Sequence, residues 1–300
     1  DLGCPVLPVP LDTDLAEPPM TEVAELHFAP VGSSGLASRM ALIADWIARA
    51  RPDLMVIDVS VEVALLARLC GVPFVYARQT GIRNDPPHLT AYRWATALWA
   101  PFDESREEES TPEWVKGKTF YSGAVTRFDG LPRPPRPDGG SERRALISTA
   151  ADEEGERLRA HFRHVPGWQV RPLPATAGLD DFAGAAVVIG PGGNNLVSET
   201  AFARRGLICV PQPRPFGEQE ARARLLRSSG MACVFPPGEW TDPGVALETA
   251  VSMAPRLESW CDGHGADRAA SFLDETVTSM RSLSGSHSIN PAALSSSSHP

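Results

Sequence analysis

The stretch AVVIGPGGNNLVSETAF, residues 186–202, decides the fold of this chain. Its first five residues are small or apolar, which predicts a short strand buried on both faces of a parallel sheet. A turn with Gly192 and Gly193 follows, and then a helix that begins near Asn195. Such a turn lets a phosphate approach the backbone, where the helix N-terminus offers unpaired N–H groups. An ordinary tight turn with asparagine as the helix cap explains the same residues.

Three polar residues beyond this turn would face the same crevice. Glu199 lies one turn into the predicted helix, where a carboxylate can accept both hydroxyls of a ribose whose phosphates lie at the helix start. Glu218 and Gln219 open the next helix and offer the acceptors and donors that a sugar requires. A first-turn acid that complements the helix dipole also accounts for Glu218 alone.

Outward from this stretch the chain alternates strands and helices, which is typical of α/β proteins with parallel sheets. Strands are predicted at 54–58, 72–76, 144–149, 167–171, 186–190, 207–210 and 232–235. Helices are predicted at 39–50 with Ser38 as the N-cap, at 61–70, from the loop 78–88 to about Ala100 with Trp94 and Trp99 on it, and at 153–164, 195–204, 217–229, 243–259 and 265–282.

The chain's densest proline cluster divides it into two parts. With 300 residues the chain suits two domains. Prolines and glycines at 128–142 exclude a helix or a central strand, so we expect an interdomain linker there. Residues 1–127 would form the first domain and 143–282 the second, and the serine-rich tail at 283–300 is expected to be disordered.

Composition limits the possible partners. The net charge is −9, and the only lysines are Lys116 and Lys118, so we expect no nucleic acid as a partner. No apolar run is long enough for an integral membrane segment. Five widely spaced cysteines favour a reducing compartment, and we predict a cytoplasmic protein. Because the chain opens at Asp1 on an apolar segment, we expect that its true beginning is absent.

The span 190–226, continuing through Gly230, resembles GT-B glycosyltransferases that use nucleotide sugars. It is similar to the lipid II N-acetylglucosaminyltransferase and to UDP-glucuronosyltransferase-like enzymes. This resemblance implies two Rossmann-like parallel-sheet domains that face a cleft. It also implies donor-binding roles, with the glycines at the diphosphate, the acid at the ribose and the acid–glutamine pair at the sugar, for Gly192, Gly193, Asn194, Asn195, Glu199, Glu218 and Gln219.

A looser match covers the first domain. RPDLMVID at 51–58 and GVPFV at 71–75 resemble the second half of a GT-B N-terminal domain, so this domain is expected to be incomplete. Asp58 matches an aspartate that, in many such enzymes, orients a histidine acting as the base. The loop expected to carry that histidine is not found, and His27 is a poor substitute.

The loop at 78–88 is expected to project toward the cleft. Its charged residues could contact an acceptor or the donor phosphates, although a solvated loop with local salt bridges explains them equally well. The candidates are Arg78, Arg83, Asp85 and His88.

The resemblance implies an inverting, metal-independent hexosyltransferase that needs no cofactor beyond its co-substrate. The expected donor is a UDP-sugar, with a TDP-sugar as the alternative, and the acceptor is a small-molecule or lipid-linked hydroxyl. The only Asp-x-Asp motif, at 12–14, does not follow a buried strand and is not expected to hold a metal. A second hypothesis is a truncated or degenerate relative that binds a nucleotide sugar without catalysis. A UDP-sugar epimerase and a nicotinamide dehydrogenase fit the residues less well, and the oligomeric state stays open.

Overall fold

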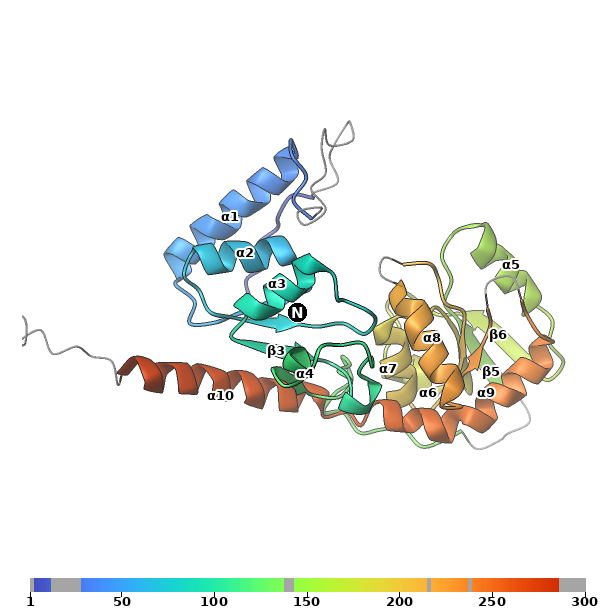
Figure 1. Ribbon diagram of the computed structural model, residues 1–300. Helices are drawn as coiled ribbons and strands as arrows, with labels where there is room; N and C mark the ends of the chain where they lie inside the picture. The colour runs from blue at the N-terminus through green and yellow to red at the C-terminus, as the bar shows by residue number, and fades with distance from the viewer. Residues whose placement is uncertain (1–2, 12–27, 138–142, 215–216, 237–238, 286–300) are drawn as a thin grey trace, which may run out of the picture.

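Two parallel sheets form the framework of the molecule (Figure 1). The computed structural model describes residues 3–11, 28–137, 143–214, 217–236 and 239–285. His27, the Asp-x-Asp motif at 12–14, and residues 138–142 and 286–300 of the expected linker and tail lie outside the described residues. The first sheet has the strand order β1 (Met55–Asp58), β2 (Phe74–Ala77), β3 (Ala97–Ala100) and β4 (Thr119–Tyr121). The second has the order β6 (Trp168–Pro172), β5 (Arg143–Ile147), β7 (Val187–Gly190), β8 (Gly206–Cys209) and β9 (Cys233–Val234). Every strand pair is parallel, which confirms the predicted α/β class.

The first domain alternates short strands with helices along the chain. Its elements are α1 (Ser34–Ala50), β1 (Met55–Asp58), α2 (Val61–Leu69), β2 (Phe74–Ala77), α3 (Pro86–Trp94), β3 (Ala97–Ala100), η2 (Glu104–Arg106), α4 (Glu113–Lys116) and β4 (Thr119–Tyr121). Its core packs β1 and β2 against α2 and α3 through Ile57, Phe74 and Tyr76.

The second domain repeats this alternation. Its elements are β5 (Arg143–Ile147), α5 (Glu153–His161), β6 (Trp168–Pro172), α6 (Leu179–Ala183), β7 (Val187–Gly190), α7 (Asn194–Phe202), β8 (Gly206–Cys209), α8 (Glu218–Ser228), β9 (Cys233–Val234), α9 (Pro243–Leu257) and η4 (Glu258–Trp260). Val188 belongs to the core on one face of the sheet, and Val187 and Ile189 belong to the core on the other. This two-sided burial explains why β7 is apolar at every position, as predicted.

The expectation of one helix up to Ala100 is wrong. Helix α3 ends at Trp94, and Ala97–Ala100 forms β3 between β2 and β4. Trp99 therefore lies on a strand, where its indole N–H donates to the Ser122 hydroxyl at 2.9 Å. Burial alternates along β3, where Leu98 and Ala100 are fully buried, and this alternation is typical of a strand. The helical spacing of the residues before β3 led to the prediction of a longer helix instead.

Helix α1 begins earlier than expected. Its N-cap is Ser33, whose hydroxyl accepts from the Leu36 N–H at 3.0 Å, and not Ser38. The other predicted helices end within a few residues of their expected limits. The last one extends to Gly285, so the first residues of the expected tail are helical.

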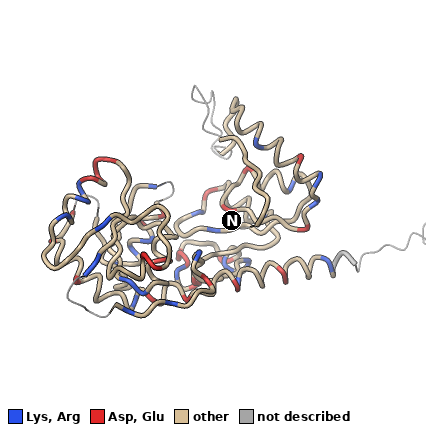
Figure 2. Tube along the Cα trace, turned by 180° about the vertical axis from the view of Figure 1, so that it is seen from behind, with Lys and Arg blue, Asp and Glu red and all other residues tan. Residues whose placement is uncertain are grey.

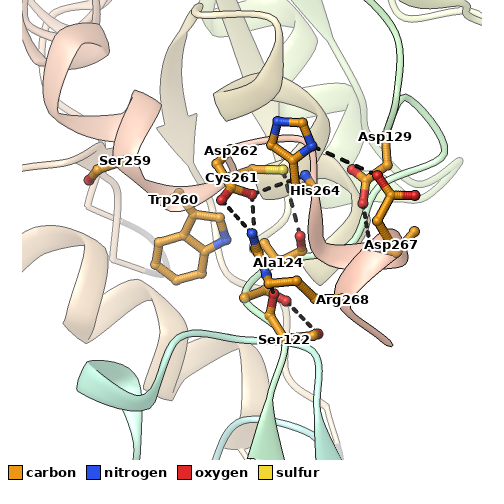
Figure 3. Close-up of polar contacts among 12 residues, drawn as sticks. Ser122, Ala124, Asp129, Ser259, Trp260, Cys261, Asp262, His264, Asp267 and Arg268 are labelled. Carbon is orange, nitrogen blue, oxygen red and sulfur yellow. Dashed lines mark hydrogen bonds and ion pairs between the residues drawn. The ribbon is translucent and has the colours of Figure 1, made fainter. Parts of the chain in front are cut away.

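Helix α10 (Gly265–Gly285), which was assigned to the second domain, packs along the first (Figure 1). Phe272 stacks on Phe120 of β4 with ring centroids 4.4 Å apart. At its start, Arg268 donates to the Ser122 carbonyl at 2.6 Å and pairs with both carboxylate oxygens of Asp262 (Figure 3). These contacts fix the second crossing of the chain between the two domains.

Candidate functional site

An open cavity of about 390 Å³ lies between the two domains and is called the interdomain cavity below. Its first-domain wall consists of the last residue of β1 and of residues that follow β2 and β3. Its second-domain wall comes from α8 and the start of α7. The lining residues are Asp58, Gln79, Thr80, Pro101, Phe102, Gly193, Asn194, Asn195, Leu196, Glu218 and Arg222. Both sheets thus direct the carboxyl ends of their strands toward one space, which is where open α/β sheets bind ligands.

The glycine turn reaches this cavity. Gly193 is the N-cap of α7 and no side chain caps this helix, so the alternative explanation of the turn by an asparagine cap does not hold. The first bond of the helix runs from the Val197 N–H to the Gly193 carbonyl at 3.2 Å. The N–H groups of Asn194 and Asn195 are therefore left for a ligand, together with the positive end of the helix dipole.

Gly192 is closely packed against its neighbours. A Cβ atom at this position would lie 3.1 Å from the Cys209 sulfur and 3.4 Å from the Gln219 carbonyl. The turn is therefore pressed against β8 and the start of α8, which fixes the direction of the α7 N-terminus. Gly193 has open space at the same point, as an approaching ligand requires.

Glu199 is buried beside the linker and does not line the interdomain cavity. Its Oε2 atom accepts from Nη2 of Arg127 at 3.2 Å, and its Oε1 atom lies 2.9 Å from Nε of the same guanidinium. Burial raises the pKa of Glu199, and the charge and hydrogen bonding of Arg127 offset this only in part. A ribose would therefore have to share this carboxylate with Arg127 or displace it, and the ribose role stays a prediction.

Glu218 lies in the cavity wall and pairs across it. Its carboxylate is 3.5 Å from Nη2 of Arg83, which belongs to the first-domain loop expected to face the cleft. Arg83 is 8% exposed. The structure thus brings together Arg83 and Glu218, which were both candidate site residues, and their ion pair joins the two domains.

Gln219 is buried and is turned toward the neighbouring loop. Its side-chain oxygen accepts from the Gln212 N–H at 3.0 Å, and the residue does not line the interdomain cavity. This bond holds the loop after β8 in place. A direct contact with the donor sugar stays a prediction.

Arg78 is buried away from the cavity, contrary to the expectation for its loop. Its guanidinium makes a two-fold bond with Glu107, at 2.7 and 2.9 Å, and donates to the Thr119 hydroxyl at 2.9 Å. Both charged side chains of the pair are less than 10% exposed. Arg78 therefore holds the loop after β3 onto the sheet instead of facing a ligand.

Asp85 and His88 form a local pair at the start of α3. The carboxylate of Asp85 caps the helix by accepting from the His88 N–H at 3.3 Å, and it lies 2.8 Å from Nδ1 of the same residue. Burial acts to raise the pKa of Asp85, but the hydrogen bonds and charge of His88 outweigh it, and the pKa is lowered. His88 is 4% exposed, and neither residue lines the cavity, so the pair serves the helix.

Asp58, the residue that the resemblance singled out, ends β1 and lines the cavity, and its catalytic role stays a prediction. The next residue, Val59, has φ +63°, a strained conformation for a β-branched residue. The Tyr76 hydroxyl donates to the Val59 carbonyl and helps to hold this backbone. Strain of this kind persists where the surrounding structure imposes it, often at functional sites. No histidine is among the described residues that line the cavity.

The sequence did not single out Arg222 or Thr80. Nη1 of Arg222 donates to the Gly192 carbonyl, and Nη2 donates to the Thr80 hydroxyl at 2.6 Å. Both residues also line a second cavity, of about 270 Å³, so their hydrogen bond separates two spaces between the domains. Arg222 lies one helical turn after Glu218, so the i, i+4 spacing in the sequence could have indicated that both side chains lie on the same face of α8.

Neither the distribution of charged residues nor the hydropathy of the helices in the described part of the chain indicates a further ligand or partner. Acidic and basic residues are interspersed along both domains (Figure 2). Among the described residues, no helix has the length and apolar character needed to cross a bilayer.

Comparison with solved structures identifies the fold. The chain is similar to the glycotransferase of kitacinnamycin (15% identity, TM-score 0.60, covering 85% of this chain and 83% of that one). It is also similar to MurG of Acinetobacter baumannii (15% identity, TM-score 0.59, covering 80% of this chain and 80% of that one). A third similar structure is the calicheamicin glycosyltransferase CalG4 (16% identity, TM-score 0.60, covering 85% of this chain and 82% of that one). No protein-family model and no curated protein match the sequence. The chain has the GT-B fold, as the resemblance implied, with two parallel-sheet domains facing a shared cavity.

Proposed function

We propose that this protein is a glycosyltransferase that moves a sugar from a nucleoside diphosphate sugar to a hydroxyl acceptor. One observation carries the proposal: the uncapped N-terminus of α7 and the carboxylate of Asp58 line the same cavity from opposite domains. The first suits a diphosphate leaving group and the second suits a group that takes up a proton. The names of two structural neighbours, the glycotransferase of kitacinnamycin and the calicheamicin glycosyltransferase CalG4, support this assignment, whereas another neighbour bears the name of a UDP-N-acetylglucosamine 2-epimerase.

In the proposed reaction, the acceptor hydroxyl attacks the anomeric carbon. The bond from that carbon to the diphosphate oxygen breaks, and the electron pair leaves with the nucleoside diphosphate. The hydroxyl proton passes to the Asp58 carboxylate. Because this is a single displacement at the anomeric carbon, the proposed reaction inverts its configuration. The N–H groups at Asn194 and Asn195 stabilise the negative charge that develops on the leaving group, the role that a metal ion would otherwise have.

The donor is proposed to be a UDP-sugar, with a TDP-sugar as the alternative. Glu218 is at the cavity wall and would bind sugar hydroxyls after exchanging its bond with Arg83. The acceptor is a small-molecule or lipid-linked alcohol that enters beside Pro101 and Phe102, the least polar part of the wall.

A second candidate function is binding of a nucleotide sugar without transfer. It is favoured by one observation, that the described part of the cavity wall contains no histidine to assist Asp58. Both candidates predict nucleotide binding, and only the first predicts turnover.

Two measurements separate the candidates. Thermal melting with UDP, TDP and ATP reports binding, and a ligand at about 100 times its Kd adds about 2.7 kcal/mol of stability. UDP release from UDP-sugars, with and without a set of alcohols, reports transfer. Asp58→Asn should lower that release about 10²- to 10⁴-fold and leave UDP affinity unchanged. Asp45→Asn, on the exposed face of α1, is the matched control.

Failure of UDP and TDP to bind would reject both candidates. Binding without turnover on any UDP-sugar or TDP-sugar would leave the non-catalytic one. Equal turnover in parent and Asp58→Asn would remove Asp58 from the chemistry.

A further inference from the structure

Arg222 is a deeply buried guanidinium in the wall of the interdomain cavity. The residue is 4% exposed, and its Nε atom is buried with no hydrogen-bond partner. Its two other nitrogens donate to the Gly192 carbonyl and to the Thr80 hydroxyl. The guanidinium is therefore held directly against the glycine turn.

The charge of Arg222 has no counterion among the described residues. Both of its acceptors are neutral. The carboxylate that acts on it most is Glu218, one turn earlier, which pairs with Arg83. Burial lowers the pKa of Arg222, and Glu218 offsets this only in part. Burying a cation without a paired anion is costly, so a fold that does so at a cavity wall indicates that an anion belongs there.

A second feature of the same wall also favours an anion. The N-terminus of α7 at Asn194 and Asn195 is uncapped and adds the positive end of its dipole. Arg222 bonds the carbonyl of Gly192, two residues before this helix, so the guanidinium and the free N–H groups converge on one region. Charged hydrogen bonds from a guanidinium to phosphate oxygens are among the strongest in proteins.

We propose that Arg222 binds the diphosphate of the donor, exchanging its bond with Thr80 for one with a phosphate oxygen. The identity of the ligand rests on the proposed function, whereas an anion site at this place does not. When the bond between the anomeric carbon and the diphosphate oxygen breaks, the added charge on that oxygen is stabilised by the guanidinium. The hydrogen bond between Arg222 and Thr80 is then broken when the diphosphate binds.

The test measures the affinities of inorganic pyrophosphate and of UDP by calorimetry on the full chain. Arg222→Gln should weaken both ligands in parallel by about 10- to 100-fold, as for the loss of a charged hydrogen-bond partner. Arg222→Lys should recover part of the loss, because it restores the charge without the planar fork. Arg224→Gln removes the same charge from an exposed position of α8 and should change neither affinity.

The variant Thr80→Val tests whether Arg222 serves to connect the two domains or to bind an anion. It removes the first-domain partner of Arg222 and leaves the charge. The proposal expects pyrophosphate affinity to be kept or increased in this variant, and a loss would overturn it. This variant and Arg222→Lys decide the question if Arg222→Gln does not fold.

The outcomes for this residue and for the proposed function are distinguishable. Pyrophosphate binding that requires Arg222, with no tighter binding of UDP or TDP, would support the anion site and reject the proposed function. UDP binding that is equal in parent and folded Arg222→Gln would leave the function and overturn the role of Arg222. Absence of pyrophosphate binding by the parent chain would also overturn it.

Discussion

The ion pair between Arg78 and Glu107 makes the first domain sensitive to a single change, Glu107→Gln. The carboxylate of Glu107 accepts two bonds from Arg78, one from the Tyr121 hydroxyl at 2.7 Å and one from the Thr111 hydroxyl at 2.8 Å. The side chains of the pair are 4% and 7% exposed. The substitution keeps the shape of the side chain and leaves the Arg78 charge buried and unpaired.

Breaking a buried pair by removing one partner costs about 3–5 kcal/mol. In a chain of this length this corresponds to a fall in Tm of roughly 6–20 °C. Urea unfolding followed by circular dichroism measures the change, with an unchanged m-value as the sign that the denatured state is unaffected. Glu109→Gln, at an exposed position two residues later, is the matched control and should stay within about 0.5 kcal/mol of the parent.

The pH dependence has a definite sign. Burial acts to raise the pKa of Glu107, but its bonds with Arg78 outweigh this, and the pKa lies below its ordinary value of 4.5. A carboxyl with a lowered folded-state pKa stabilises the protein above its unfolded-state pKa, and this stability is lost as the pH falls through the folded-state value. The difference between parent and Glu107→Gln should therefore be largest above pH 4.5 and shrink below it. A destabilisation under 1 kcal/mol at pH 7, or a difference that grows on acidification, would refute the reasoning.

Two further changes test the contacts between the domains. Arg127→Ala leaves the Glu199 carboxylate buried without its two-fold partner, which raises further a pKa that burial already raises. Because the folded variant then binds more protons at this carboxyl than the unfolded one, its free energy of unfolding relative to the parent should fall as the pH rises above 4.5, and a difference that stays flat would contradict this. In Gly265→Ala a Cβ would lie 2.2 Å from the Ala124 carbonyl. This overpacking at the start of α10 should cost about 1–3 kcal/mol in urea unfolding, whereas Gly178→Ala, with open space around it, should cost less.

The sequence predicted the second domain closely because burial there is complete. Strand β7 packs against one hydrophobic core on each face, so all of its residues are small or apolar and the strand is recognisable in the sequence. Strand β3 was missed because it follows α3 with only two residues between them, and its alternating burial depends on β2 and β4 as neighbours. The spacing of apolar residues along one segment does not show which strands that segment pairs with.

Which residues line the cavity was easier to predict where this depends on the backbone than where it depends on side-chain direction. The turn at Gly192 and Gly193 follows from strand, glycine and helix in order, and it reaches the cavity. Loop 78–88 offered charged residues without showing which of them would turn inward. Arg78 packs under the loop, Arg83 meets Glu218, and Thr80, which has no charge, lines the cavity.

Two arginines show why burial alone does not separate structure from function. Arg78 and Arg222 are both 4% exposed, and each donates to a threonine hydroxyl. Arg78 also has the carboxylate of Glu107, so its charge is neutralised within the fold and its removal affects stability first. Arg222 has neutral acceptors and borders an open cavity beside a helix N-terminus, and Glu218 offsets its burial only in part, so an entering anion would supply the missing ion pair. The counterion, more than the depth of burial, therefore identifies which of the two belongs to a binding site.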